Sequence, residues 1–174
     1  MFVSIIIPTF NGASRIGHCL NALLPQTIGR DVEILVIDDG STDNLAEVIP
    51  RFDRAAVRII TQMHAGPAAA RNRGAAEAKG QIILFTDDDC VPMPDWLNAM
   101  TRPFEDAAVV GVKGVYRTEQ KSLVARFVQI EYEDRYRKMA DLPRIDFIDT
   151  YSAGFRRDNF LEMTGYDRPI SGRD

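Results

Sequence analysis

The chain has 174 residues, of which 45% are hydrophobic and 26% are charged. A chain of this size and composition buries about 70% of the surface that it exposes when unfolded, so we expect one globular domain and no disordered segment. The formal net charge of −4 gives no overall positive field that would favour nucleic acid. The two cysteines, Cys19 and Cys90, fit neither a zinc motif nor a disulfide framework, which indicates a reduced, cytoplasmic protein. No apolar run approaches the roughly 20 residues that cross a bilayer, and no signal segment precedes the first strand.

Segments typical of strands and of helices alternate over the first two thirds of the chain. The predicted strands are short, nearly continuous apolar runs, as in strands covered on both faces: 3–7, 32–37, 56–60 and 81–85. The predicted helices repeat apolar residues every three or four positions: 16–24, 45–52, 68–78 and 94–104. Ser41 or Asp43 is the expected N-cap of the second helix, and Gly66 with Pro67 is expected to begin the third. This order predicts an α/β fold with a mostly parallel sheet and helices on both faces.

The last third is less regular. It contains one more predicted strand, 109–116, and a long polar helix, 122–139. Leu123, Phe127 and Ile130 share one face of that helix, which we expect to pack partly against the body of the protein while the other side is solvated. The alternative is an amphipathic patch that touches a membrane or a lipid-linked substrate.

Acidic residues follow two of the predicted strands. Asp38 and Asp39 end the second, and Asp87, Asp88 and Asp89 end the fourth. Turns favour aspartate for backbone reasons alone, but parallel strands bring their carboxyl ends to one edge of a sheet, where ligands bind. Carboxylates that gather there repel one another unless a cation neutralises them.

The residue types point to a hard cation and a phosphorylated ligand. Oxygen ligands suit Mg²⁺ or Mn²⁺, and Asp87 and Asp89 point to the same side if the strand stays extended. Such an ion completes its shell with substrate phosphates, so a nucleoside diphosphate is the expected ligand. Asp38 or Asp39 can accept from a ribose or a base, and Arg71 can donate to the same site. Neither G-x-G-x-x-G after the first strand nor a P-loop motif occurs, which disfavours dehydrogenases and P-loop ATPases.

Four short stretches resemble the motifs of family-2 glycosyltransferases with the GT-A fold, in the same order and at similar spacing. They are S-I-I-I-P-T-F-N from Ser4, D-D-G-S-T-D from Asp38, A-R-N-R-G from Ala70 and F-T-D-D-D from Phe85. The resemblance implies a Rossmann-like central sheet and a nucleotide-sugar site. By the same resemblance, this site contains Pro8, Thr9, Asp38, Asp39, Arg71, Asp87 and Asp88, with Asp89 on the metal.

The resemblance continues on the acceptor side. The stretch from Ser152 to Arg157 is similar to the acceptor-side segment, and Gly165–Asp167 and Gly172–Asp174 are similar to later pieces whose final acid is the catalytic base. This makes Asp174 the expected base, although Arg168 and Arg173 stand where the family usually has glutamates. The whole of 1–174 is then one domain, with a donor-binding half at 1–116 and a partial acceptor-side half at 117–174.

The function implied is an inverting, metal-dependent transfer of a sugar from a nucleoside-diphosphate sugar, a UDP-sugar before other donors, to an acceptor hydroxyl. The expected acceptor is a saccharide or is lipid-linked, as in synthesis of polysaccharide, glycolipid or cell-envelope glycan, with peripheral contact at the inner face of the membrane. Two alternatives are kept: a nucleotide-sugar-binding module without turnover, and a sugar nucleotidyltransferase. The sequence does not name the sugar, the acceptor or the oligomeric state.

Overall fold

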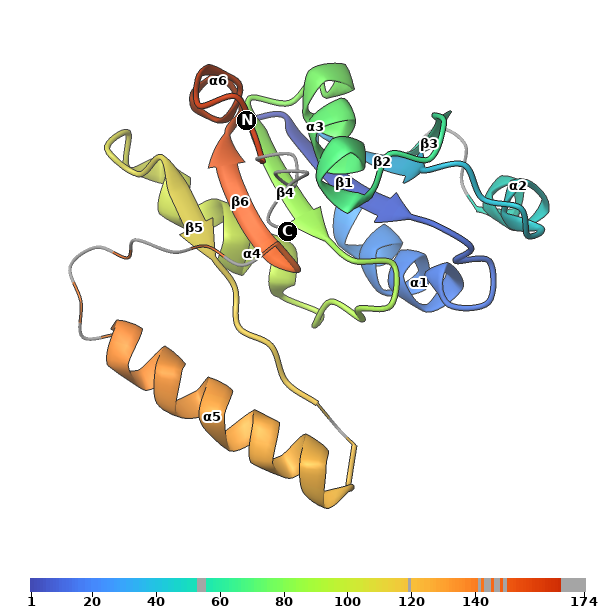
Figure 1. Ribbon diagram of the computed structural model, residues 1–174. Coiled ribbons are helices and arrows are strands. Elements are labelled where there is room, and N and C mark those ends of the chain that lie inside the picture. Colours follow the sequence, from blue (N-terminus) through green and yellow to red (C-terminus); the bar gives the residue numbers. More distant parts are fainter. Residues whose placement is uncertain are drawn as a thin grey trace, which may run out of the picture.

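A single six-stranded sheet lies between two layers of helices (Figure 1). The computed structural model describes residues 1–52, 56–118, 120–140, 142, 145, 148 and 150–166. The strands are β1 Val3–Thr9, β2 Val32–Asp38, β3 Val57–Thr61, β4 Ile82–Thr86, β5 Gly111–Lys113 and β6 Ser152–Arg156. Their order is β3-β2-β1-β4-β6-β5, with β1 to β4 parallel and β6 antiparallel to both β4 and β5. The predicted mostly parallel sheet is confirmed.

Helices cover both faces of the sheet, also as predicted. The described helices are α1 Ile16–Thr27, α2 Leu45–Val48, α3 Pro67–Glu77, α4 Trp96–Thr101, α5 Leu123–Ala140 and α6 Arg157–Glu162, with short 3-10 turns at Ile49–Arg51 and Arg102–Glu105. Of these, α5 covers neither face. Alternate residues of a strand point to opposite faces. Ile5 and Ile7 therefore pack with α1, α2 and α4, whereas Ile6 packs with α3 and α6. Burial on both sides explains why these strands are continuous apolar runs.

Helix α3 lies very close to the sheet because its inner face carries only small residues. Ala70 and Ala75 are fully buried, and a Cβ at Gly74 would collide with Ile6. The helix begins with Pro67 at its first position after Gly66, whose φ is +90°, as the sequence predicted.

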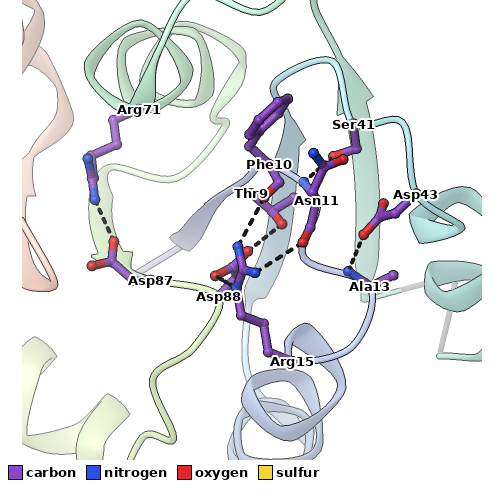
Figure 2. A network of polar contacts seen from close by, with 10 residues as sticks. All are labelled: Thr9, Phe10, Asn11, Ala13, Arg15, Ser41, Asp43, Arg71, Asp87 and Asp88. Atoms are coloured by element: carbon purple, nitrogen blue, oxygen red, sulfur yellow. Dashed lines mark hydrogen bonds and ion pairs between the residues drawn. The ribbon is translucent and has the colours of Figure 1, made fainter.

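The expected cap of α2 is partly right. Asn44 occupies the N-cap position of this four-residue helix and its own side chain makes no cap, but Asp43 Oδ1 accepts from the Leu45 N–H at the start of the helix, at 3.2 Å. Ser41 and Asp43 also bind the loop after β1: Ser41 Oγ accepts from the Asn11 N–H at 2.9 Å, and Asp43 Oδ2 accepts from the Ala13 N–H at 2.9 Å (Figure 2). Both side chains thus accept hydrogen bonds from a loop that is about 30 residues away in sequence.

Two expectations for the last third also fail. The strand predicted at 109–116 is only Gly111–Lys113, since its single neighbour is β6. Helix α5 buries none of its residues, and Leu123, Phe127 and Ile130 are 83%, 63% and 62% exposed. The expectation that their shared face packs against the body is therefore wrong. In Figure 1, α5 stands apart from the layers, beyond the end of the sheet where β4 ends and β6 begins.

Candidate functional site

A cavity of about 490 Å³ opens at the carboxyl edge of the sheet. The chain order reverses between β1 and β4, since β2 and β3 lie on one side of β1 and β4 on the other. Ligands of open parallel sheets bind at such a switch point, and this cavity has the size of a small-molecule site. Its lining includes all the described residues that the sequence predicted for the site except Asp38: Pro8, Thr9, Asp39, Arg71, Asp87, Asp88 and Asp89.

Thr9 and Asp88 close the switch point from its two sides. Thr9 Oγ1 donates to Asp88 Oδ2 at 2.5 Å, and both side chains are buried. Arg15, at the start of α1, donates from Nε to Asp88 Oδ1 at 2.7 Å (Figure 2). Both carboxylate oxygens of Asp88 thus accept hydrogen bonds from the protein, and these bonds fix the turn after β4 to the loop after β1.

Arg15 binds this loop as well as Asp88. Its Nη1 and Nη2 donate to the backbone oxygens of Asn11 and Phe10, each at 3.0 Å. The hydrogen bond to Asp88 raises the pKa of the Arg15 guanidinium above its ordinary value. Sequence reasoning missed Arg15; the available signal was a fork-shaped donor four residues after Asn11, beside an edge rich in acids.

Gly12 lets Thr9 and Asp88 meet. A Cβ built there would collide with both Thr9 Oγ1 and Asp88 Oδ2. The glycine in this loop is thus required by close approach, in addition to ending the strand.

Arg71 and Asp87 form an ion pair on the other side of the cavity (Figure 2). Arg71 Nη2 lies 2.5 Å from Asp87 Oδ1, with the two side chains 8% and 32% exposed. The guanidinium also lies 5.9 Å from the centre of the Tyr166 ring. Among the described residues, the buried Arg71 Nε has no hydrogen-bond partner. A buried arginine with an unused donor at a cavity wall suits an anionic ligand.

Asp39 organises the segment that leads into α3. Its Oδ1 accepts from Gln62 Nε2 at 2.6 Å and from the Ala65 N–H at 2.9 Å. Its Oδ2 accepts from the Gly66 N–H at 2.8 Å and lies 2.9 Å from His64 Nδ1. A carboxylate has about four acceptor sites, so a nucleobase could bind Asp39 only by displacing the Gln62 or His64 side chain.

Asp38 is buried and does not line the cavity. Its Oδ1 accepts from the Ser41 N–H at 2.8 Å, and its Oδ2 lies 3.5 Å from the Thr61 hydroxyl. This is the geometry of an aspartate that shapes its own turn.

Three potential metal ligands converge after β4. One ligand atom from each of Asp87, Asp89 and Cys90 lies within 4.8 Å of the others. The strand does not stay extended here, because β4 ends at Thr86 and the Cys90 N–H donates to the Asp87 carbonyl in a turn. The turn nevertheless brings the two carboxylates together.

The ligand types fit a hard divalent ion. Burial, followed by the charges of Asp87 and Asp89, raises the pKa of the Cys90 thiol to about 11. Two carboxylates with free coordination positions are what Mg²⁺ or Mn²⁺ uses when phosphates and water complete its shell.

An aromatic pair that the sequence reading missed forms part of the cavity wall. The Phe10 and His64 rings lie 4.2 Å apart at 32°, and both residues line the cavity. Phe10 is 41% exposed, so part of its ring is accessible to a ligand in the cavity. Such rings suit the stacking of a nucleobase.

The stretch from Ser152 to Arg157 forms β6 and the start of α6, and its arginines bind backbone carbonyls. Arg156 donates from Nε to the Val109 carbonyl at 2.9 Å, and Arg157 from Nε to the Ala75 carbonyl at 3.0 Å. The following piece is held to α3, because the Asn72 side chain exchanges two 2.8 Å hydrogen bonds with the Tyr166 backbone. Asp174 lies outside the described residues, together with the rest of 167–174.

The sequence profile of glycosyl transferase family 2 matches residues 4–163. The chain belongs to this family. It is 41% identical over 100 residues to the glycosyltransferase AglE of Haloferax volcanii, an alignment that covers 55% of this chain and 33% of AglE. It is 32% identical over 124 residues to the poly(ribitol-phosphate) beta-glucosyltransferase of Bacillus spizizenii, covering 66% of this chain and 20% of that protein. The chain thus spans a third or less of these two relatives.

Solved glycosyltransferases share the fold. A mannosyltransferase of Pyrobaculum calidifontis, in complex with GDP-Man and Mn²⁺, superposes with a TM-score of 0.75 at 23% identity, covering 97% of this chain and 48% of its own. Residues 1–349 of S. aureus TarS, in complex with UDP-GlcNAc, superpose with a TM-score of 0.66 at 20% identity, covering 94% and 48%. The expected GT-A fold of family 2 is confirmed.

Proposed function

We propose that this family-2 domain binds a nucleoside-diphosphate sugar in the cavity at the switch point and transfers the sugar to an acceptor hydroxyl with inversion. The observation that carries the proposal is the convergence of Asp87, Asp89 and Arg71 at one cavity wall. Two carboxylates for a divalent ion beside a buried arginine match the charges of a diphosphate with its metal.

The nucleobase of the donor binds between the carboxyl end of β1 and the aromatic pair of Phe10 and His64. Pro8 and Thr9 form one wall, and the accessible part of the Phe10 ring, with His64, offers a stacking surface. Asp39 holds the loop behind this slot and can accept from a base if Gln62 gives way. A UDP-sugar is the proposed donor, as UDP-sugars are bound in two of the solved neighbours, while a third holds GDP-Man.

The proposed metal is Mg²⁺ or Mn²⁺, held by Asp89 with Asp87. Solved neighbours are complexes with Mn²⁺. When bound, the ion would neutralise charge on the diphosphate leaving group. Asp88 does not share this task, because Thr9 and Arg15 occupy its carboxylate. Its proposed part in donor binding is to hold the edge in place.

Asp174 is proposed as the general base that removes the acceptor proton. A positioned base contributes roughly 10²–10⁴ in rate, so Asp174→Asn should lower turnover by that factor and leave donor affinity unchanged. The proposed acceptor is a saccharide or lipid-linked hydroxyl of cell-envelope glycan synthesis, a proposal supported by the match to a poly(ribitol-phosphate) beta-glucosyltransferase.

Calorimetry with UDP, GDP and dTDP, each with and without Mn²⁺, tests the site. We expect tighter binding with the metal for at least one nucleotide, and Asp89→Asn should remove that gain. Asp31→Asn is the matched control, because it removes the same charge from an exposed position beside the amino end of β2. Equal affinities with and without metal would reject the metal site.

A separate assay of donor hydrolysis and sugar transfer distinguishes catalysis from binding alone. Metal-dependent binding without either reaction would favour the binding module. Release of pyrophosphate from a nucleoside triphosphate and a sugar phosphate would favour the nucleotidyltransferase instead. Neither outcome is expected.

A further inference from the structure

The outer face of the first half of α5 is apolar and open. Leu123, Phe127 and Ile130 follow one another at helical spacing and are 83%, 63% and 62% exposed. Val124 beside them is 75% exposed, and Val115 in the preceding segment is 70% exposed. Single exposed apolar side chains are ordinary, but a row of adjacent ones on a helix marks an interaction surface.

The opposite face of α5 ties the helix to the body. Tyr136 Oη accepts from the Tyr116 N–H at 3.0 Å and lies 2.6 Å from Tyr151 Oη. The Tyr132 ring lies 6.3 Å from the Tyr151 ring, nearly perpendicular to it. Tyr132 comes nine residues after Leu123, and at 3.6 residues per turn this places the two side chains on opposite sides of the helix. Because the tyrosines contact the body, the apolar row faces away from it.

Cationic side chains border the apolar row. Arg117, Lys121 and Arg126 are basic, and Lys121 lies two residues before the first residue of the helix. Within the described parts of the chain, none of the three forms an ion pair with a carboxylate. One acid, Glu119, lies in the same stretch of sequence, which leaves 115–130 with a surplus of positive charge.

The second half of α5 differs. Its charges form two blocks, the acids Glu131, Glu133 and Asp134 followed by the bases Arg135, Arg137 and Lys138, and Lys138 pairs with Asp134 at 2.6 Å. None of the described helices is long and apolar enough to cross a membrane. A helix with an apolar side, a polar side and basic flanks lies along a bilayer surface instead of spanning it.

We propose that the outer face of α5, from Leu123 to Ile130, together with Arg117, Lys121 and Arg126, binds the surface of an anionic lipid bilayer. The apolar row enters the boundary between headgroups and acyl chains, and the basic residues contact lipid phosphates. Charge supports lipid as the occupant. The three cations have no carboxylate partner among the described residues, and an anionic surface complements them.

This surface shares no residue with the nucleotide cavity, but it lies on the same side of the molecule as the proposed donor site. Helix α5 lies beyond the end of the sheet where β4 ends (Figure 1), and the proposed donor site follows β4. A bilayer held by α5 would therefore lie on the side of the molecule where the donor is expected. Membrane binding does not require donor binding, so each proposal can fail without the other.

Sedimentation with lipid vesicles tests this inference. The purified protein is mixed with vesicles of phosphatidylcholine alone or of phosphatidylcholine with phosphatidylglycerol. We expect binding to the anionic vesicles to be at least about tenfold tighter, and to weaken as salt rises. Absence of binding to anionic vesicles, or equal binding to both kinds, overturns the proposal.

Two double variants separate the apolar and the basic contributions. Leu123→Ser with Phe127→Ser, and Lys121→Glu with Arg126→Glu, should each lower vesicle affinity about tenfold or more. The control is Ile28→Ser with Met163→Ser, which removes two apolar side chains that are 80% and 59% exposed elsewhere. Its vesicle affinity should match the wild type.

The same variants test the competing occupant. Analytical ultracentrifugation without lipid should give one unchanged oligomeric state for the wild type and for the Leu123 and Phe127 double variant. If the wild type associates and this variant does not, the face belongs to a second copy and the lipid proposal fails. Unchanged unfolding midpoints would show that each variant keeps its fold, as exposed positions predict.

Discussion

Thr9 at the end of β1 donates its hydroxyl to the Asp88 carboxylate after β4, at 2.5 Å. The two residues come from strands that are neighbours in the sheet but 79 positions apart in the chain. Their bond lies where the strand order reverses, and Arg15 binds the second oxygen of Asp88. The edge that carries the proposed donor site is therefore fixed by a buried polar contact before any ligand binds.

Gly12→Ala should break this contact. The new Cβ would collide with Thr9 Oγ1 and Asp88 Oδ2, so one of them must move. We expect the free energy of unfolding to fall by about 1–3 kcal/mol, as for other overpacked sites, with weaker nucleotide binding. Urea unfolding and calorimetry measure the two effects.

Gly17→Ala is the matched control for that change. Gly17 lies within α1, where the nearest atom to a new Cβ is Phe52 Cζ at an ordinary 3.8 Å. Alanine is favoured over glycine inside a helix by roughly 0.5–1 kcal/mol, so this variant should be as stable as the wild type or more so. If Gly12→Ala and Gly17→Ala had the same free energy of unfolding, the close approach at Gly12 would not contribute to stability.

Asp88→Asn and Asp89→Asn should have different consequences although the two residues are adjacent in the sequence. The Asp88 variant loses an acceptor that faces Thr9 and Arg15, so we expect about 1–3 kcal/mol of destabilisation and weaker nucleotide binding with or without metal. Asp89 is exposed, so its variant should unfold within about 0.5 kcal/mol of wild type and lose only the metal-dependent gain. Thermal unfolding and titration with Mn²⁺ distinguish them. A stable Asp88 variant with normal nucleotide binding would contradict the role of Asp88 in holding the turn after β4 to Thr9 and Arg15.

The first four strands were readable from the sequence to within about two residues, because each is an apolar run followed by polar residues or proline. The predicted strand 109–116 is only Gly111–Lys113, and β6 was not predicted as a strand. The direction of each aspartate was not readable. Asp87, Asp88 and Asp89 follow one another, but the turn sends Asp88 to Thr9 and Arg15 and leaves Asp89 exposed. Turn geometry of this kind depends on partners dozens of residues away.

The same limit explains the other misses. The apolar period of α5 correctly predicted a helix with an apolar face, but a period does not say what covers that face. Arg15 appears in the sequence as one basic residue beside a helix start, and only the fold brings it to Asp88. Phe10 and His64 lie 54 positions apart, and the sequence gives no sign that their rings meet.

Phe10→Ala should weaken the binding of UDP, GDP and dTDP alike. Stacking on an aromatic face is worth about 1–3 kcal/mol per base and depends little on which base is bound, so the loss should be roughly 5- to 150-fold. Phe10→Tyr keeps the ring and should bind like the wild type. Calorimetry gives the affinities. A loss confined to one nucleotide, or none at all, would place the base away from this ring.

Asp39→Asn should loosen the start of α3. The Asp39 carboxylate accepts from the backbone N–H groups of Ala65 and Gly66, and an asparagine would present an NH₂ group to one of them. Both hydrogen bonds are partly buried, so an unpaired N–H here should cost about 1 kcal/mol, the lower end of the range for a buried group. Since Arg71 lies on α3, nucleotide affinity should fall as well, even without a direct contact from Asp39.

Asp38→Asn is the matched control for the Asp39 variant. Its side-chain carbonyl can still accept from the Ser41 N–H, and the Thr61 hydroxyl can rotate to accept, so less than about 1 kcal/mol should be lost. Hydrogen exchange locates the difference: the amides of Ala65 and Gly66 should exchange faster in the Asp39 variant alone. Equal protection in both variants would mean that Asp39 does not hold this loop, and that its carboxylate is free to bind the nucleobase directly.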